Sequence, residues 1–346
     1  MTTPCLNRRA LLTGAAALAA CEGRAQPDPR NPPPPLKSLA SFPLGVAVNA
    51  AALEQPAYAG LVTRHFDQVT ADWEMKMEII LGADGGLDFE QPDAIARFAR
   101  EHGLRLFGHT LAWHEQKPSY FRGMLGDRPA FARAYARYIG AVVGRYRGLA
   151  IGWDAVNEAV AEDGEGLRGG YWSEALGWDY IDLAFGHARQ ADPAAVLFLN
   201  DYNLERMPAK RRSFLRLAEG LLKRGAPLGG LGTQCHLDLD DDPRAIGASL
   251  RDLAGLGLPI HVSELDVRAR PRTADLQAQA RLVGAAAEAF AALPARQRFA
   301  FTVWGVRDRD SWRRADDPTQ QPLLFDDAGR AKPAFWAAAD AWRGVR

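Results

Sequence analysis

Two glutamates stand near the ends of apolar runs, where a buried strand would be expected. Glu158 closes the run in "GWDAVNEAV", and Glu264 lies within "HVSELDV". An acid is rarely buried unless it is paired or has a function. Two carboxyl groups that face each other can divide a reaction, one transferring a proton while the other attacks or activates water. The elements that bring them together must therefore be identified.

Eight short apolar runs along the chain are typical of buried strands. They cover residues 44–49, 68–74, 105–111, 151–158, 196–202, 230–237, 259–267 and 300–306. Between them lie helical patterns, such as Phe131, Tyr135, Tyr138 and Val142, which keep one face apolar. This count predicts an α/β fold, a (β/α)8 TIM barrel, as a single domain over residues 38–346. The alternative is an open doubly wound sheet, but no G-x-G-x-x-G follows the first strand.

Charge and composition narrow the function. The 346 residues are 47% hydrophobic, and the 42 Lys and Arg balance the 42 Asp and Glu. This is enough apolar material for a large core. No basic block extends beyond residues 210–212, so we expect no nucleic-acid partner.

The N-terminal segment predicts export. In residues 1–21, Arg8 and Arg9 precede about ten apolar residues, too few to span a bilayer. The arginine pair resembles a twin-arginine signal, and residues 18–21 resemble a lipoprotein cleavage site that would leave a lipid anchor on Cys21. An ordinary cleaved signal is the alternative. Residues 22–37 are proline-rich and predict an extended linker, which suits a periplasmic, outer-membrane or secreted protein.

The three cysteines predict no disulfide in the mature domain. Cys5 would leave with the signal and Cys21 would carry lipid, so Cys235 would have no partner. Cys235 could also be a nucleophile, but no cysteine-hydrolase signature surrounds it.

Polar residues gather at the predicted strand ends. In a (β/α)8 barrel the active site lies at the C-terminal ends of the strands. A single acid there is more often a helix cap or a loop residue, but polar residues recur at seven of the eight ends, which indicates an enzyme. They are Asp72, Glu74, Lys76, His109, Trp113, His114, Asn157, Glu158, Asn200, Asp201, Asn203, Gln234, His236, Glu264, Asp266, Trp304, Asp308 and Trp312.

Two glutamates, amides and indoles suit glycoside hydrolysis. One carboxylic acid protonates the leaving oxygen, a second carboxylate acts at the anomeric carbon, and flat aromatic faces stack on sugar rings. Glu158 and Glu264 end the fourth and seventh predicted strands, so they can converge over the barrel axis. A gap of about 5 to 5.5 Å would specify retention of configuration, and roughly 6.5 to 9.5 Å would specify inversion.

The motifs together resemble the family 10 glycoside hydrolases, the endo-1,4-β-xylanases. The resemblance runs from about residue 44 to residue 342. It implies a retaining enzyme that acts on xylan or xylo-oligosaccharides, on a (β/α)8 barrel, with no required cofactor or metal. The motifs, in order, are "KMEIIL", "GHTLAWH", "WDAVNEAV", "LFLNDYN", "GTQCHL", "HVSELDV", "FTVWGVRDRDSW" and "LLFDDAGRAKPAFW".

The resemblance implies a role for each carboxylate. Glu158 matches the general acid/base and Glu264 the nucleophile. We expect the charge of Glu264 to raise the pKa of Glu158. We also expect His236, oriented by Asp266, to keep Glu264 ionised.

The remaining matches concern residues that bind the substrate. Asn157 matches the side chain that binds the 2-hydroxyl of the cleaved sugar. The resemblance implies polar contacts to the sugar or to the glutamates for Lys76, His109 and Gln234. It implies that Trp113, Trp304 and Trp312 form the aromatic walls of the central subsites.

Several residues have plainer interpretations. His109 and His114 could form a zinc pair, but no third ligand is tied to them by spacing. Trp304 on its own could be a core residue. Three polar residues are interpreted as structural: Asp154, Asp201 and Asn203.

The sequence departs from the family pattern at two places. Asp72 and Trp73 stand where the family usually has Glu-Asn, so Trp73 could restrict the glycone side or point elsewhere. Near the last strand, Arg307 and the Arg309-Asp310 pair replace the usual residues, and their charge could favour glucuronate-decorated xylan.

Two other functions are compatible with the sequence. One is a related barrel glycosidase that acts on cellulose or another β-glycan, since the same glutamates would serve. The other is a non-catalytic surface lipoprotein that binds glycans. The presence of both glutamates with Asn157 and His236 argues against a site that has lost its activity.

Overall fold

The structure is a computed structural model that describes residues 32–343. The export-signal prediction, with Cys5 and Cys21, and most of the linker lie outside the described residues. One compact unit begins at Pro35. Leu36 and Lys37, predicted to lie in the linker, pack on the second helix, where the Leu36 amide donates to His65 Nδ1 at 3.2 Å and Lys37 Nζ donates to the Thr63 carbonyl. Across this described range, none of the helices combines the length and apolarity needed to cross a membrane.

Eight parallel strands close into a barrel, as predicted. Hydrogen bonding follows the order β10-β1-β2-β3-β5-β6-β7-β9, and β10 pairs with β9 to close the ring. Each predicted run overlaps one of these strands. Their bounds are β1 Leu44–Val48, β2 Gln68–Ala71, β3 Arg105–Gly108, β5 Ala150–Asn157, β6 Val196–Asp201, β7 Gly230–Thr233, β9 Ile260–Arg268 and β10 Arg298–Val303. Two short strands, β4 (Ala112–Trp113) and β8 (His236–Asp238), extend the pairing beside β5 and β9.

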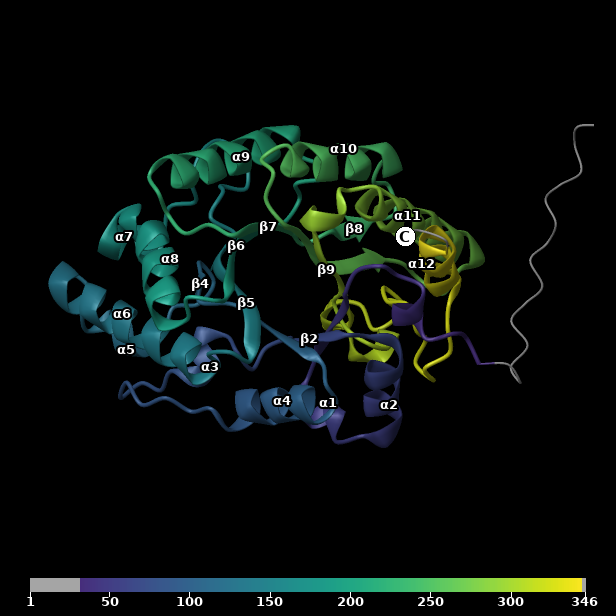
Figure 1. The fold of residues 1–346 in the computed structure, drawn as a ribbon, viewed down its shortest axis with the longest axis horizontal. Helices are drawn as coiled ribbons and strands as arrows, with labels where there is room; N and C mark the ends of the chain where they lie inside the picture. Colours follow the sequence, from purple (N-terminus) through teal and green to yellow (C-terminus); the bar gives the residue numbers. More distant parts are fainter. Residues whose placement is uncertain (1–31, 344–346) are drawn as a thin grey trace, which may run out of the picture. The chain divides into compact units, whose positions relative to one another are not determined.

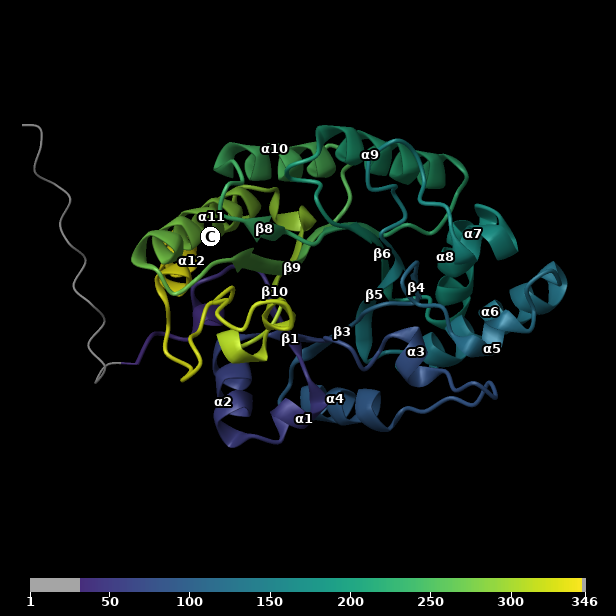
Figure 2. The ribbon, with the colours of Figure 1, turned by 180° about the vertical axis from the view of Figure 1, so that it is seen from behind.

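Helices surround the strands (Figure 1), and the view from behind shows β1, β3 and β10 completing the ring (Figure 2). The α-helices are α1 Ala50–Leu53, α2 Pro56–His65, α3 Met77–Ile80, α4 Glu90–Glu101, α5 Ser119–Arg122, α6 Arg128–Arg145, α7 Tyr171–Leu176, α8 Asp179–Ala191, α9 Pro208–Lys223, α10 Pro243–Ala254, α11 Thr273–Ala291 and α12 Pro333–Trp342. The 3-10 turns are η1 Leu36–Ser38, η2 Ala295–Gln297, η3 Asp308–Asp310 and η4 Trp312–Arg314.

The apolar faces of the helices bury against the barrel. The predicted stripe on α6, Phe131, Tyr135, Tyr138 and Val142, is buried along its whole length. On α12, Trp342 packs edge-on against Phe301 of β10, with ring centres 5.3 Å apart. Such aromatic contacts bury large areas and fix the helix against the strand.

The inside of the barrel is filled below the strand ends. Phe107, Phe198, His261 and Phe299 come from β3, β6, β9 and β10 and pack edge to face or tilted, with ring centres 4.6 to 5.8 Å apart. This layer closes the barrel interior. The C-terminal ends of the strands are therefore left to carry polar groups.

Candidate active site

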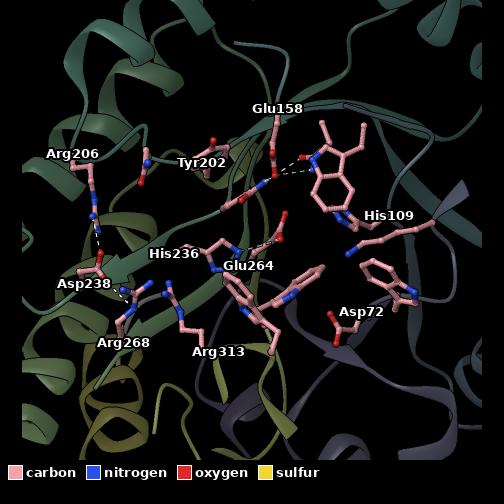
Figure 3. A pocket seen from close by; sticks show the side chains of 18 residues that line it. Asp72, His109, Glu158, Tyr202, Arg206, His236, Asp238, Glu264, Arg268 and Arg313 are labelled. Atoms are coloured by element: carbon pink, nitrogen blue, oxygen red, sulfur yellow. Dashed lines mark hydrogen bonds and ion pairs between the residues drawn. The ribbon is translucent and has the colours of Figure 1, made fainter. Parts of the chain in front are cut away.

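A cleft of about 580 Å³ lies at the C-terminal ends of the strands. Glu158 and Glu264 both project into it (Figure 3). Both glutamates line it together with all eight predicted substrate-contact residues: Lys76, His109, Trp113, Asn157, Gln234, His236, Trp304 and Trp312. Asp266 is buried behind this wall and bonds to His236, as the resemblance implied.

A chain of side-chain amides joins the two glutamates. Gln234 Nε2 donates to Glu158 Oε1 at 3.0 Å and to Asn157 Oδ1 at 3.2 Å. Asn200 Nδ2 donates to the same Asn157 oxygen at 3.0 Å and to Glu264 Oε1 at 2.8 Å. The amides therefore hold both carboxylates in one rigid arrangement.

Local packing fixes the orientation of Asn200. Ser263 Oγ donates to Asn200 Oδ1 at 2.8 Å, which leaves the amide nitrogen to face Glu264. Gly232 on β7 makes room, because a Cβ there would lie 2.3 Å from Asn200 Oδ1. Asn200 thus holds Glu264, a contact that sequence reasoning did not predict although Asn200 was among the strand-end residues.

Glu158 is buried with a backbone φ of 58° at the end of β5. Burial raises its pKa, but hydrogen bonds from His114, Gln234 and Trp113 outweigh burial, and the net pKa lies below the ordinary value. His114 Nε2 is 2.9 Å from Glu158 Oε2. The expected raised pKa is therefore wrong for the free protein, because these donors favour the ionised form.

A histidine cation stands beside Glu264. His236 Nε2 lies 3.4 Å from Glu264 Oε2, and its Nδ1 lies 2.9 Å from Asp266 Oδ1. Burial lowers the pKa of His236, but Asp266 and Glu264 outweigh burial and raise it to about 9. Asp266 also accepts from Trp312 Nε1 and Arg313 Nε, each at 2.8 Å. His236 therefore lies between Asp266 and Glu264, as expected, with its positive charge beside the Glu264 carboxylate.

Three indoles surround the ammonium of Lys76. Its Nζ lies 4.4 Å from the ring centre of Trp73, 4.9 Å from that of Trp113 and 6.0 Å from that of Trp304. These are cation–π distances. Trp73, 45% exposed, lines the cleft over Lys76, so it does not point elsewhere.

His109 and Asp154 form a buried pair in the barrel, with Nδ1 2.8 Å from Oδ2. Burial raises the pKa of Asp154 and lowers that of His109, which favours a pair without separated charge. Within residues 32–343, His109, Asp154 and Glu264 each offer one nitrogen or carboxylate oxygen of the kind that binds metals, and these three atoms lie within 4.8 Å of one another. His114 is not part of this group and contacts Glu158 instead.

The cleft also includes residues that sequence reasoning did not assign to substrate. Asn203, for which a structural role is predicted, lines the cleft, and its Nδ2 donates to Glu162 Oε1 at 3.4 Å. Asp201 is buried and accepts from the Val160 and Tyr202 amides, as a structural residue does. Position at a strand end was the available signal for five of the others, because Asp72 and Trp73 follow β2, Tyr202 follows β6, and Asp238 and Arg268 are the last residues of β8 and β9. The remaining lining residues are Asp72, Trp73, Tyr202, Arg206, Asp238, Arg268 and Arg313.

Arg307 does not face the cleft. Its side chain is buried, with Nε 2.6 Å from Asp310 Oδ2 and the guanidinium over the ring of Tyr58. Arg307 therefore offers no free charge to the cleft, because Asp310 already neutralises it. Arg309 is about half exposed, and the expected preference for glucuronate-decorated xylan stays a prediction.

A cleft with two carboxylates, an amide relay and indole walls at the top of a closed barrel defines the class of (β/α)8-barrel glycoside hydrolases. The sequence model of Glycosyl hydrolase family 10 matches residues 36–341. The chain belongs to this family.

Relatives in the family carry related names. The chain is 34% identical over 321 residues to Exoglucanase XynX of Acetivibrio thermocellus, covering 88% of this chain and 29% of that protein. It is 32% identical to Endo-1,4-beta-xylanase 3 of Hypocrea jecorina, covering 87% of this chain and 82% of that one. The chain spans less than a third of the length of the first bacterial relatives.

Solved structures show the same fold. A mutant of TsXylA, a xylanase from Thermoanaerobacterium saccharolyticum in complex with xylotetraose, has a TM-score of 0.83 and 34% identity, covering 88% of this chain and 98% of that one. Native xylanase 10B from Thermotoga maritima has a TM-score of 0.82 and 30% identity, covering 89% and 97%.

Proposed function

We propose that the protein hydrolyses internal 1,4-β-xylosidic bonds of xylan with retention of configuration. One observation carries the proposal: Glu158 and Glu264 share one cleft, and a chain of amides connects them. Family 10 relatives that are named endo-1,4-β-xylanases support the choice of substrate.

The geometry suits two chemical steps. Glu264 attacks the anomeric carbon and forms a glycosyl ester, while Glu158 gives its proton to the leaving oxygen. Glu158 then takes a proton from water, and that water displaces Glu264 from the sugar. The His236 cation stabilises the carboxylate of Glu264 before attack and after release.

The first step needs the protonated form of Glu158. A bound sugar chain covers the cleft and removes water from the carboxyl group, which favours the neutral form. Substrate binding would thus counter the donors that hold Glu158 ionised in the free protein.

Separate replacement of the two glutamates tests the assignment. On an aryl β-xyloside with a good leaving group, Glu264→Ala should lose the first step altogether. Glu158→Ala should keep that step, which needs little protonation, and regain turnover with added azide. Identical behaviour of the two variants would refute the roles. Failure of the unmodified protein to release reducing sugar from any β-linked xylan or glucan would refute the enzyme, and would favour a glycan-binding protein.

A second substrate class has one supporting observation, because a relative at 34% identity is named an exoglucanase. Comparing the hydrolysis of xylan with that of carboxymethylcellulose at equal enzyme concentration separates the two substrate classes. Faster release of reducing ends from the cellulose derivative would replace xylan by a β-glucan.

We also propose that the protein is exported and anchored by lipid at Cys21. The sequence of residues 1–21 and the following linker support this. Mass spectrometry of the membrane fraction tests it, since an anchored protein carries acyl mass on an N-terminal Cys21. An unmodified N-terminus would indicate an ordinary cleaved signal.

A further inference from the structure

Arg168 contacts the backbone of Glu158. It lies between β5 and α7, where its Nε donates to the carbonyl oxygen of Glu158 at 3.1 Å. Its own amide donates to the Ala159 carbonyl at 2.7 Å. Glu158 has φ near +58°, a region that residues with a Cβ rarely adopt. Surrounding contacts must therefore hold this conformation.

The other end of the Arg168 guanidinium reaches the cleft wall. Its terminal nitrogen donates to the Tyr202 hydroxyl at 2.9 Å and to Glu162 Oε2 at 3.3 Å. Tyr202 lines the cleft, and its ring is backed by the fully buried Lys210, whose Nζ lies 3.3 Å from the ring centre. Lys210 in turn lies 3.0 Å from Asp201 Oδ1. Arg168 thus bridges the Glu158 peptide and an anchored wall residue.

The Glu158 segment is held from two sides. On the barrel side, the Glu158 amide donates to the Asn200 carbonyl at 2.8 Å, and the Val160 amide donates to Asp201 Oδ2 at 3.1 Å. On the opposite side, the Glu158 carbonyl accepts from Arg168 Nε. Loss of Arg168 would free this carbonyl while the β6 contacts remain.

We propose that Arg168 is a positioning residue, which fixes the Glu158 peptide so that the carboxyl group meets the leaving oxygen. The inference rests on the proposed function, because it concerns the acid step of that reaction. Arg168 acts through Glu158 and is not a catalytic residue. Its loss should impair proton donation more than sugar binding.

A leaving-group series measures proton donation directly. Substituted phenyl β-xylosides keep the aglycone nearly constant in size while the leaving-group pKa varies. A correctly positioned general acid makes kcat/KM depend less on the leaving-group pKa. General acid catalysis raises the rate by about 10²- to 10⁴-fold. For Arg168→Gln we expect little change with dinitrophenyl xyloside and a loss of roughly 10- to 100-fold with phenyl xyloside.

Two variants serve as controls. Tyr202→Phe removes the wall bond but keeps the carbonyl bond, so it should lower kcat/KM evenly across the series. Arg224→Gln removes an exposed arginine that pairs with Asp182 on α8, and it should change nothing. Arg168→Lys keeps the charge and stem but cannot bridge both partners, so its slope should be steeper than that of the unmodified protein. Arg168→Lys also provides the test of the positioning role if Arg168→Gln does not fold.

The outcomes separate this inference from the proposed function. An even loss across the series in both Arg168 variants, or an unchanged slope, would overturn the positioning role. The same steepening in Tyr202→Phe would assign the effect to the wall and also overturn it. If the unmodified protein cleaves none of the xylosides and no xylan, the proposed function itself fails.

Discussion

Gln234 donates a hydrogen bond to Glu158 across 3.0 Å, although 76 residues separate them in the chain. The bond favours the ionised carboxylate, because an amide N–H bonds more strongly to a negatively charged oxygen than to a neutral carboxyl oxygen. Together with His114 it keeps the pKa of Glu158 below its ordinary value despite burial.

Gln234→Leu should raise the pKa of Glu158. A hydrogen bond to a buried charged group is worth about 1.5 to 3 kcal/mol, which corresponds to roughly one to two pKa units. The alkaline limb of the pH profile of kcat/KM should therefore move to higher pH by that amount. A limb that stays in place or moves to lower pH would contradict this account of Glu158.

The charge of His236 makes stability depend on pH. Its pKa rises from 6.5 to about 9 on folding. This contribution is fully present below pH 6.5 and is lost as pH rises through about 9, because the unfolded histidine gives up its proton first. A shift of this size corresponds to an upper limit of about 3 kcal/mol.

Urea unfolding at pH 6 and at pH 9.5 checks this linkage. The unfolding free energy should decrease from pH 6 to pH 9.5. The decrease should be smaller in His236→Gln, which has no imidazole to titrate. An equal fall in both proteins would show that other groups cause it.

Trp73 should bind sugar on the face that Lys76 does not cover. Its ring is 45% exposed, it lines the cleft, and aromatic faces stack on sugars. We expect Trp73→Ala to raise KM for xylo-oligosaccharides by roughly 5- to 20-fold, with little change for an aryl β-xyloside that places one sugar beside the glutamates. Trp178→Ala, which removes an equally exposed indole outside the cleft lining, is the control. A gain in kcat/KM on long substrates would mean instead that Trp73 blocks a subsite.

Asp266→Asn should destabilise the fold. Asp266 is buried and accepts from His236, Trp312 and Arg313, so its loss leaves charged partners unpaired inside the protein. Breaking a buried pair costs about 3 to 5 kcal/mol.

The matched change Asp326→Asn breaks the exposed pair with Arg330 and should cost no more than about 0.5 kcal/mol. Thermal unfolding compares the two. A similar Tm for both variants would show that the Asp266 network contributes little.

The barrel was predictable because its signals are local. The run over residues 151–158 became β5, and the stripe from Phe131 to Val142 became the buried face of α6. The period and length of the apolar pattern are enough to predict such elements, because strands and helices bury their apolar residues at a regular spacing. Motif order then placed Glu158, Glu264 and their eight neighbours in one cleft, because strand ends converge in a closed barrel.

The electrostatics were not predictable in the same way. The sequence showed that Glu158 and Glu264 are near each other, and like charge alone predicts a raised pKa for Glu158. The lowered pKa arises from Gln234, just after β7, and from His114, in the loop before α5, and the direction of these donors depends on side-chain packing. The sequence likewise suggested that Arg307 faces substrate, whereas the fold buries it against Asp310.

The chain alone thus determined the elements, their order and the gathering of carboxylates at the strand ends, because periodicity and motif spacing are properties of neighbouring residues. Only the tertiary structure decided which groups donate to Glu158, that Arg168 holds its backbone, and that Trp73 lies over Lys76. Those contacts join residues far apart in the chain at distances of a few ångströms. Hydrogen bonds and pKa values depend on such distances, which no spacing in the sequence records.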